Sequence, residues 1–194
     1  MKKPGSRTRA KLFVVSAPSG CGKTTLCNRL LADGLGLANS VSMTTRSPRP
    51  GEKAGFDYRF VSRKRFKKLI TKRAFLEHEE NFGNLYGTPR KFIQNNLSGG
   101  VPVLLSIDVK GAMKVQRAYP RTSRLIFVLP PSIAALRARL EARSSDGAAE
   151  IARRLGLARK EIAYKRKYDH VIVNDRLDAS YKKLKKIITE ELEG

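Results

Sequence analysis

Four short apolar runs recur along the chain, and helical patterns stand between them. The runs have strand length and cover residues 12–17, 101–108, 124–130 and 170–175. Continuous apolar runs of this kind are typical of parallel strands buried on both faces. Helices are predicted at residues 23–33, 111–119, 132–143 (with Ser132 as the N-cap) and 178–193. The alternation predicts an α/β fold with a doubly wound parallel sheet, whose site lies at the carboxyl ends of the strands.

Two segments depart from this alternation. Residues 42–88 are rich in Gly, Pro, Tyr and Thr, and predict a small strand-rich subdomain inserted into the core. Residues 143–154 (RSSDGAAEIARR) are polar and predict a mobile lid. We expect a core made of residues 11–41 and 89–194, preceded by a basic tail at residues 1–10.

The charge is strongly positive and favours anionic partners. The 194 residues include 40 Lys and Arg against 17 Asp and Glu, a formal net charge of +23. Such a field attracts polyanions, so a nucleic-acid-binding protein is one interpretation. The basic residues are spread along the chain, however, without an RNA-recognition or zinc-finger signature. In residues 63–68 (RKRFKK) their helical spacing leaves Phe66, Leu69 and Ile70 facing inward. We therefore favour a basic enzyme surface and expect no specific nucleic acid.

Cysteine usage and hydropathy indicate the cellular compartment of the protein. Cys21 and Cys27 are the only cysteines, too few for a disulfide framework or a four-cysteine zinc site. No apolar run approaches the ~20 residues that span a bilayer, and the first apolar stretch is too short for a signal peptide. The sequence thus predicts a cytoplasmic protein without a membrane contact, and it leaves the oligomeric state open.

A phosphate-binding loop follows the first apolar run. It comprises Ala17, Pro18, Ser19, Gly20, Cys21, Gly22, Lys23 and Thr24, and matches G-x-x-x-x-G-K-[ST] except for alanine at the first position. Gly20 and Gly22 let backbone N–H groups turn toward one anion, and the next helix adds its positive end. Lys23 suits the terminal phosphates of a nucleotide, and the Thr24 hydroxyl suits Mg²⁺. The loop predicts nucleotide binding, while the absence of N-K-x-D argues against a switch GTPase.

A second set of motifs connects the chain to a known family. Residues 42–52 carry S-x-T-T-R-x-P-R-x-G-E, Tyr86 begins a Y-G pair, and residues 172–175 are I-V-N-D. With these motifs the chain resembles the guanylate kinases from about Lys11 to the C-terminal helix. The resemblance implies a P-loop NTPase-like fold, transfer of the γ-phosphate of ATP to GMP, Mg²⁺ accompanying ATP, and a GMP site in the insert.

The insert contains the groups that an acceptor phosphate needs. Arg46 and Arg49 are three residues apart and can present two guanidinium groups to one dianionic phosphate. Tyr58 and Tyr86 can each add a hydroxyl donor. We predict that these four residues bind the GMP phosphate.

The guanine base presents a different chemistry. Its N1–H and N2–H₂ form a two-donor edge that a carboxylate such as Glu77 matches, and adenine lacks that pair. The resemblance assigns Ser42, Thr88 and Asp108 to the base as well. Glu77 lies in the acidic run EHEE, so a solvated surface charge is the alternative for this residue alone.

Phosphoryl transfer depends mainly on the placement of cations. We predict that Lys23 with Mg²⁺ serves the donor, and the resemblance implies that Arg139, Arg143 and Arg154 close over both phosphates. Ordinary exposed helix positions are predicted for Arg137 and Arg153.

Asn174 and Ser106 each allow more than one interpretation. The resemblance places Asn174 at the adenine of ATP, with a helix cap as the alternative. Ser106 stands where the family usually has an acidic residue, so Asp108 must act alone or with the serine hydroxyl and water. A catalytically silent binding module is therefore a second function class, although such modules typically lose the loop lysine and the phosphate arginines that this chain keeps.

Overall fold

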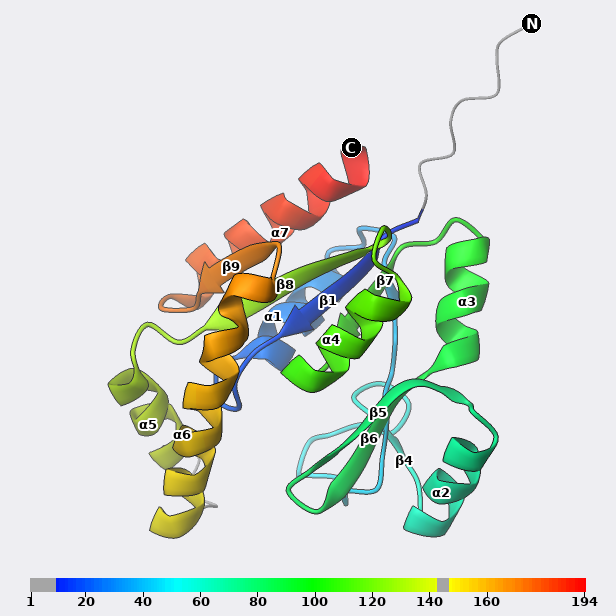
Figure 1. Cartoon of the computed structure of the whole chain (residues 1–194). Coiled ribbons are helices and arrows are strands. Elements are labelled where there is room, and N and C mark those ends of the chain that lie inside the picture. The colour runs from blue at the N-terminus through cyan, green and yellow to red at the C-terminus, as the bar shows by residue number, and fades with distance from the viewer. Residues whose placement is uncertain (1–9, 143–146) are drawn as a thin grey trace, which may run out of the picture.

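A five-stranded parallel sheet forms the centre of the molecule. The computed structural model describes residues 10–142 and 147–194 (Figure 1). The strand order is β2-β7-β1-β8-β9, and every neighbouring pair is parallel. The strands are β1 (Leu12–Ser16), β2 (Ala38–Asn39), β7 (Val103–Ser106), β8 (Ser123–Leu129) and β9 (His170–Val173). Because the chain reverses its direction of travel across the sheet at β1, the sheet is doubly wound, as predicted.

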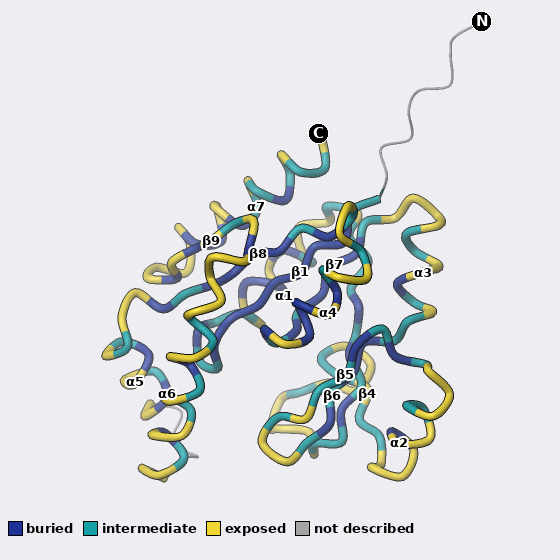
Figure 2. Tube along the Cα trace, in the orientation of Figure 1, coloured by how far each residue is buried: buried dark blue, intermediate teal, exposed yellow. Residues whose placement is uncertain are grey.

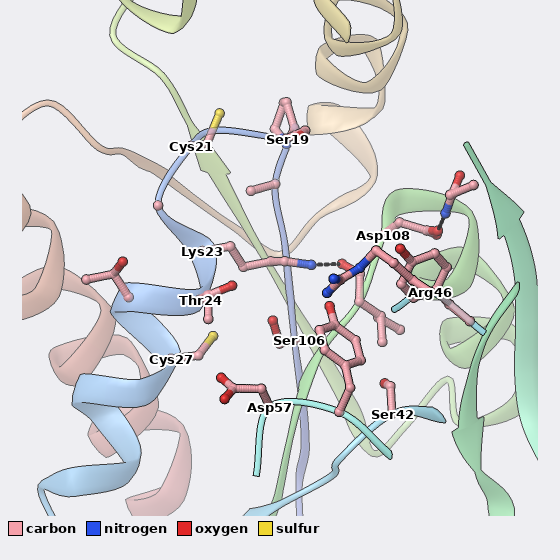
Figure 3. Close-up of a pocket in the computed structure, with 18 of the residues that line it drawn as sticks. Ser19, Cys21, Lys23, Thr24, Cys27, Ser42, Arg46, Asp57, Ser106 and Asp108 are labelled. Atoms are coloured by element: carbon pink, nitrogen blue, oxygen red, sulfur yellow. Dashed lines mark hydrogen bonds between the residues drawn. The ribbon is translucent and has the colours of Figure 1, made fainter. Parts of the chain in front are cut away.

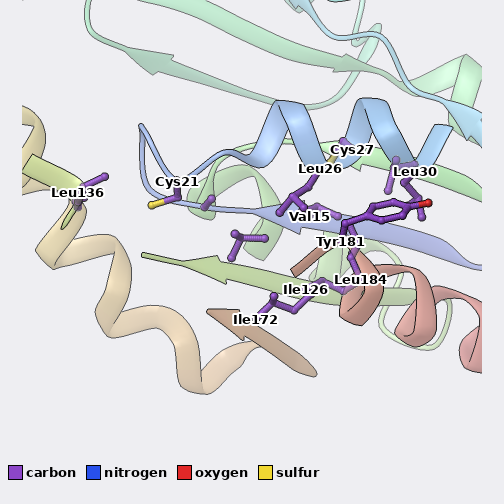
Figure 4. Packing of buried hydrophobic residues seen from close by; sticks show 14 of the residues in the cluster. Val15, Cys21, Leu26, Cys27, Leu30, Ile126, Leu136, Ile172, Tyr181 and Leu184 are labelled. Atoms are coloured by element: carbon purple, nitrogen blue, oxygen red, sulfur yellow. The ribbon is translucent and has the colours of Figure 1, made fainter. Parts of the chain in front are cut away.

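Helices cover both faces of this sheet because its strands are apolar on both sides. The central helices are α1 (Lys23–Ala32), α3 (Arg90–Ser98), α4 (Val109–Ala118), α5 (Ile133–Glu141), α6 (Ala148–Ile162) and α7 (Leu177–Glu193). Phe13 and Val15 face a cluster with residues of α1 and α5 to α7, whereas Leu12 and Val14 face α3 and α4. Figure 4 shows the first cluster, where Leu26 of α1 and Leu184 of α7 meet the strands.

A second sheet stands apart from the central one. Its order is β4-β3-β6-β5, with β6 antiparallel to both neighbours. It is built from β3 (Met43–Thr44), β4 (Arg59–Phe60), β5 (Phe75–Asn81) and β6 (Asn84–Pro89), with helix α2 (Arg63–Thr71) packed on it. Phe66 of α2 is fully buried against Phe75 and Leu85, so the basic run of α2 faces outward as predicted. Figure 2 shows this exposed outer side of α2.

Several local predictions are confirmed, and one segment differs. Ser132 caps α5, because its hydroxyl accepts a hydrogen bond from the Ala135 N–H at 3.0 Å. The predicted lid is partly helix: residues 148–154 begin α6, which continues through Ile162 and the 3₁₀ turn Ala163–Lys167. Its buried Ile151 and Leu155 are spaced four apart, a signal hidden by the polar residues around them. Residues 143–146 lie outside the described residues.

Within the described ranges, no helix combines the length and the apolar character needed to cross a bilayer.

Candidate active site

A cavity of about 290 Å³ opens at the carboxyl ends of the central strands. It is lined by the phosphate loop, by the second sheet and the loop that precedes it, by the end of β7, and by α6. In Figure 3 Lys23 reaches into it from α1, while Arg46 and Ser42 come from the opposite side. The topology thus brings the two groups of predicted binding residues to one space.

Two glycines shape the phosphate loop. Gly20 and Gly22 have φ angles of 92° and 80°, a left-handed conformation that L-residues avoid. Gly22 is also the N-cap of α1, so the loop leads directly into the positive end of that helix. All eight predicted loop residues, 17–24, line the cavity.

Lys23 is held toward the end of β7. Its Nζ donates to the carbonyl of Ile107 at 2.7 Å. Burial lowers the pKa of Lys23, and the negative charges of Asp108 and Glu161 oppose that shift. An ammonium in this position is available to phosphates that enter beside the loop.

Glu52 holds both Arg46 and Arg49 in place, although this carboxylate is not among the residues predicted for the site. Arg46 Nη2 donates to both Glu52 oxygens, at 2.7 and 3.0 Å, and the Arg49 N–H donates to Oε2 at 2.7 Å. Burial by itself would raise the pKa of Glu52, but these bonds lower it overall. Tyr58 and Tyr86 pack edge to face with ring centroids 6.0 Å apart, and the Arg46 guanidinium lies 5.4 Å from the Tyr58 ring centroid. All four predicted phosphate ligands line the cavity.

Glu77 is a buried carboxylate on the cavity wall. It is 7% exposed, and the Thr88 hydroxyl donates to its Oε1 at 2.5 Å. Burial raises its pKa to about 7, the Thr88 bond lowers it, and the charge of Asp108 raises it further. Ser42 lines the same cavity, whereas Thr88 contributes through Glu77. The buried position rules out the solvated-charge interpretation of Glu77.

Gly111 makes room for this carboxylate. A Cβ at Gly111 would lie 2.8 Å from Glu77 Oε2 and 3.4 Å from Asp108 Oδ1. Real Cβ atoms do not approach that closely, so a side chain here would displace Glu77.

Asp108 is held from two sides. It is the N-cap of α4, where Oδ1 accepts from the Gly111 N–H at 2.7 Å, and Oδ2 accepts from Asn81 Nδ2. Asn81 ends β5 and lines the cavity. The sequence offers no signal for this contact, because 27 positions and a change of sheet separate the two residues. Ser106 faces the cavity two residues before Asp108, as strand geometry predicts.

Glu161 of α6 is a further carboxylate of the cavity that the sequence did not single out. Burial raises its pKa to about 7, Asp108 adds to the shift, and Lys23 opposes it. In the sequence it is one charge in a basic helical stretch, and only the packing of α6 reveals its position.

The arginines expected to cover the phosphates occupy different places. Arg154 lines the cavity, bonds Glu150 at 3.0 Å and lies 5.7 Å from the Phe82 ring centroid. Arg153, predicted to be an ordinary exposed position, also lies over Phe82, at 4.2 Å. Arg143 lies outside the described residues, and the exposed Arg137 pairs with Glu141.

Arg139 and Asn174 lie behind the phosphate loop. Arg139 Nη2 donates to the carbonyl of Asn174 at 2.9 Å, and Asn174 Nδ2 donates to the carbonyl of Cys21 at 2.8 Å. Asn174 does not cap the following helix, because the N-cap of α7 is Arg176. The helix-cap alternative for Asn174 is therefore wrong.

Comparisons with known proteins agree on one family. A family model described as guanylate kinase matches residues 9–191. The guanylate kinase of Wolbachia pipientis wMel is 47% identical over 185 residues, 95% of this chain and 92% of the relative. That of Caulobacter vibrioides is 46% identical over 191 residues, 98% of this chain and 90% of the relative.

A solved structure adds the fold. The crystal structure of guanylate kinase from Anaplasma phagocytophilum is similar with a TM-score of 0.80 and 38% identity, covering 94% of this chain and 86% of that one. The matches span nearly the whole chain and include both sheets. The chain therefore belongs to the guanylate kinase family, the enzymes that phosphorylate GMP.

Proposed function

We propose that the enzyme transfers the terminal phosphoryl group of ATP to GMP, with ATP on the loop of residues 17–24 and GMP against the second sheet. One observation carries this arrangement. Lys23 faces the cavity from one side, Arg46 and Arg49 face it from the other, and Arg154 faces it from α6. Two phosphate groups that repel each other need such a space, with cations on every side.

The reaction requires positioning more than proton transfer. An oxygen of the GMP phosphate attacks the γ-phosphorus of ATP, the bond to the β,γ-bridging oxygen breaks, and ADP leaves with that electron pair. Charge spreads over the equatorial oxygens in the transition state. We assign the donor phosphates to Lys23 and the loop amides, and the acceptor phosphate to Arg46, Arg49, Tyr58 and Tyr86.

Base selection falls to Glu77. Its carboxylate accepts from N1–H and N2–H₂ of guanine, with Ser42, Thr88 and Asp108 as the surrounding polar groups. The Thr88 hydroxyl occupies Oε1 and thereby orients the carboxylate.

The donor set suits Mg²⁺. The cavity presents the Thr24 hydroxyl at the start of α1 together with oxygen atoms of Ser106, Asp108 and Glu161. Mg²⁺ typically takes few protein oxygens beside nucleotide phosphates and water. Thr24 would hold the ion, whose charge neutralises phosphate oxygens.

Among the predicted arginines we assign the phosphates to Arg154, because it lines the cavity. Arg139 and Arg143 remain candidates for closure over the nucleotides. We also propose a reduced cytoplasmic setting, which Cys21 and Cys27 support, because both are buried thiols that do not form a disulfide.

The test is ADP release from ATP with GMP, AMP, CMP or UMP as the acceptor. We expect turnover with GMP and a loss of orders of magnitude in Lys23→Ala, with GMP affinity kept. Turnover with no acceptor, or undiminished turnover in Lys23→Ala, contradicts the assignment. A silent binding module would bind GMP without any release of ADP.

A further inference from the structure

The turn between β5 and β6 contains an aromatic residue in a strained conformation. Asn81 pairs with Asn84, so Phe82 and Gly83 form the whole loop of this hairpin. Their φ angles are 51° and 75°, both positive, as in the type I′ turn that two-residue hairpin loops favour. Such positions favour Asn, Asp and Gly, because a larger side chain makes the left-handed conformation costly. Phe82 therefore weakens the turn, which indicates a role other than forming it.

Neighbouring residues hold the strained turn in place. Arg63 of α2 donates from Nη1 to the Gly83 carbonyl at 3.0 Å and from Nη2 to Glu80 at 3.1 Å. Asn84 Nδ2 donates to the Phe82 carbonyl at 3.2 Å. The backbone of the turn is thus fixed to α2 and β6, while Phe82 lines the cavity.

The Phe82 ring contacts α6. The guanidinium carbon of Arg153 lies 4.2 Å from the ring centroid, and that of Arg154 lies 5.7 Å from it. Cations this close to an aromatic ring are attracted to its negative face. In Figure 1 the turn of the β5–β6 hairpin points toward α6. The ring therefore joins the insert, which carries Glu77 and the phosphate arginines, to the helix that carries Arg154.

Arg154 is restrained by a carboxylate as well as by the ring. Its Nε donates to Glu150 Oε1 at 3.0 Å, and its side chain is 14% exposed. Arg153 bonds the same carboxylate at 2.9 Å, so Glu150 offsets the charge of both arginines. An arginine side chain has many rotamers, and these contacts restrict them. The protein itself thus orients Arg154 at the cavity wall.

We propose that Phe82 is a positioning residue for phosphoryl transfer, whose ring fixes Arg154 beside the phosphates and holds the insert against α6. This inference rests on the proposed assignment of the phosphates to Arg154. A cation that already stands where charge develops accelerates the reaction, because it needs no reorganisation in the transition state. The strain at Phe82 is then explained by catalysis and not by stability.

Removal of the ring should lower turnover without lowering stability. Phe82→Asn introduces a residue that the turn favours, so Tm should stay at the wild-type value or rise by up to about 4 °C. We expect kcat with ATP and GMP to fall about tenfold, because Arg154 is no longer held in place. Phe82→Gly should behave in the same way, since glycine adopts the same φ angle freely, and it replaces Phe82→Asn if that variant does not fold.

Each substrate should keep its own affinity when it binds alone. Under the proposed function the insert holds GMP, and the loop of residues 17–24 holds the phosphate chain of ATP. Inorganic tripolyphosphate reports on the loop, because it has that phosphate chain and no base. Calorimetry should give dissociation constants for GMP and for tripolyphosphate within about twofold of wild type in Phe82→Asn. A loss of GMP affinity, or a lower Tm, overturns the proposal in favour of general support of the insert.

Two further variants serve as controls. Phe82→Tyr retains an aromatic face for the arginines and should keep kcat within about twofold of wild type. Tyr164→Asn is the matched control, because Tyr164 is 38% exposed, like Phe82 at 37%, and its ring centroid lies 5.0 Å from Lys167 Nζ. This variant should leave kcat unchanged. An equal loss of kcat in Phe82→Tyr and Phe82→Asn contradicts a role of the ring.

A double-mutant cycle tests whether Phe82 acts through Arg154. Arg154→Ala should lower kcat, and adding Phe82→Asn to it should lower kcat no further, whereas additive losses overturn the proposal. If Arg154→Ala keeps full turnover, the assignment of the phosphates to Arg154 is itself wrong and this inference falls with it. Full turnover in Phe82→Asn beside an impaired Arg154→Ala removes the inference alone.

Discussion

Glu77 presents one oxygen to Thr88 and keeps the other for a ligand. Within the described residues its hydrogen bond comes from the Thr88 hydroxyl to Oε1, and Oε2 lies over Gly111. Burial deprives such a carboxylate of water, so a matching donor pair on a ligand has a large effect. We propose that the guanine edge supplies that donor pair.

Glu77→Gln tests this match. The amide retains an oxygen for Thr88 and places an NH₂ where guanine presents its own donors. We expect the ratio of kcat/KM for GMP over AMP to fall at least about a hundredfold. Glu79→Gln, on the same strand but paired with Lys114, should leave the ratio unchanged. An equal ratio in wild type and Glu77→Gln would remove Glu77 from the base site.

The raised pKa of Glu77 also predicts a pH dependence of stability. Burial raises the pKa to about 7 in the folded protein, above the ordinary value of 4.5. Between these values the unfolded chain releases the proton while the folded chain keeps it. The free energy of unfolding therefore falls as pH rises from 4.5 to 7, by at most about 3 kcal/mol. Urea titrations of wild type and Glu77→Gln at pH 5 and pH 8 measure the difference. The free energy of unfolding of wild type, relative to that of Glu77→Gln, should be lower at pH 8 than at pH 5. An equal difference at both pH values contradicts the raised pKa.

Gly111 sets the position of the same carboxylate through space alone. In Gly111→Ala the new methyl group would lie 2.8 Å from Glu77 Oε2, so Glu77 must move. We expect GMP to bind at least about tenfold more weakly, equivalent to ~1.4 kcal/mol, with tripolyphosphate unaffected. Gly156→Ala on α6, with nothing within 4 Å of its Cβ position, is the control. Equal losses for both ligands would indicate general unfolding instead.

Site residues can be predicted from the sequence only where they belong to a recognisable motif. The phosphate loop is identifiable because glycines, lysine and threonine must stand in one order between a strand and a helix. Asn81 and Glu161 escape that reasoning, since each reaches the cavity from an element distant in sequence. Asn174 was predicted to be at the donor, but its contact with Cys21 depends on how β9 packs beside the loop.

At the scale of elements, the four longer strands of the central sheet follow from their apolar runs. β2 has two residues, too short for a periodic signal, and it forms because Ala38 and Asn39 pair with Val103 and Leu104. Helix α3 was missed between the insert and β7. Its residues have a clear amphipathic pattern with Ile93 buried, so the sequence does carry a signal for this helix. A two-residue strand such as β2 is specified by its neighbours rather than by its own sequence.

The second sheet has a small core of its own. Phe66 stacks on Phe75 with centroids 4.4 Å apart, and Leu85 completes the buried cluster. Phe66→Ala should cost about 3–5 kcal/mol locally and weaken GMP binding, while tripolyphosphate binding survives. Phe66→Leu preserves more of the side-chain volume, so this variant should lose much less stability. The effect is measured by comparing amide hydrogen exchange in β5 and β6 of the second sheet with exchange in β1 and β8 of the central sheet. An equal loss of protection in both sheets would contradict a separate core.

At the scale of the whole molecule, positive charge exceeds the needs of the site. The acidic side chains form ion pairs such as Lys185–Asp33 and Arg124–Glu191, yet the net charge is +23. The basic faces of α2 and α7 lie outside the cavity, on exposed surface. A field of this sign raises the local concentration of anionic nucleotides around the entrance.

The same field predicts non-specific attraction to nucleic acids and no specific complex. Counterion release makes such binding fall steeply between 50 and 200 mM salt. We expect DNA and RNA of any sequence to bind weakly at low salt and to dissociate at the higher concentration. ATP and GMP should still bind at that salt concentration, because we propose that their phosphates contact Lys23, Arg46 and Arg49, which line the cavity, where screening is weaker. Fluorescence anisotropy with two unrelated oligonucleotides, with and without both nucleotides, measures this. Submicromolar binding to one defined sequence that survives 200 mM salt and added nucleotides would show that the charge serves a nucleic-acid partner instead.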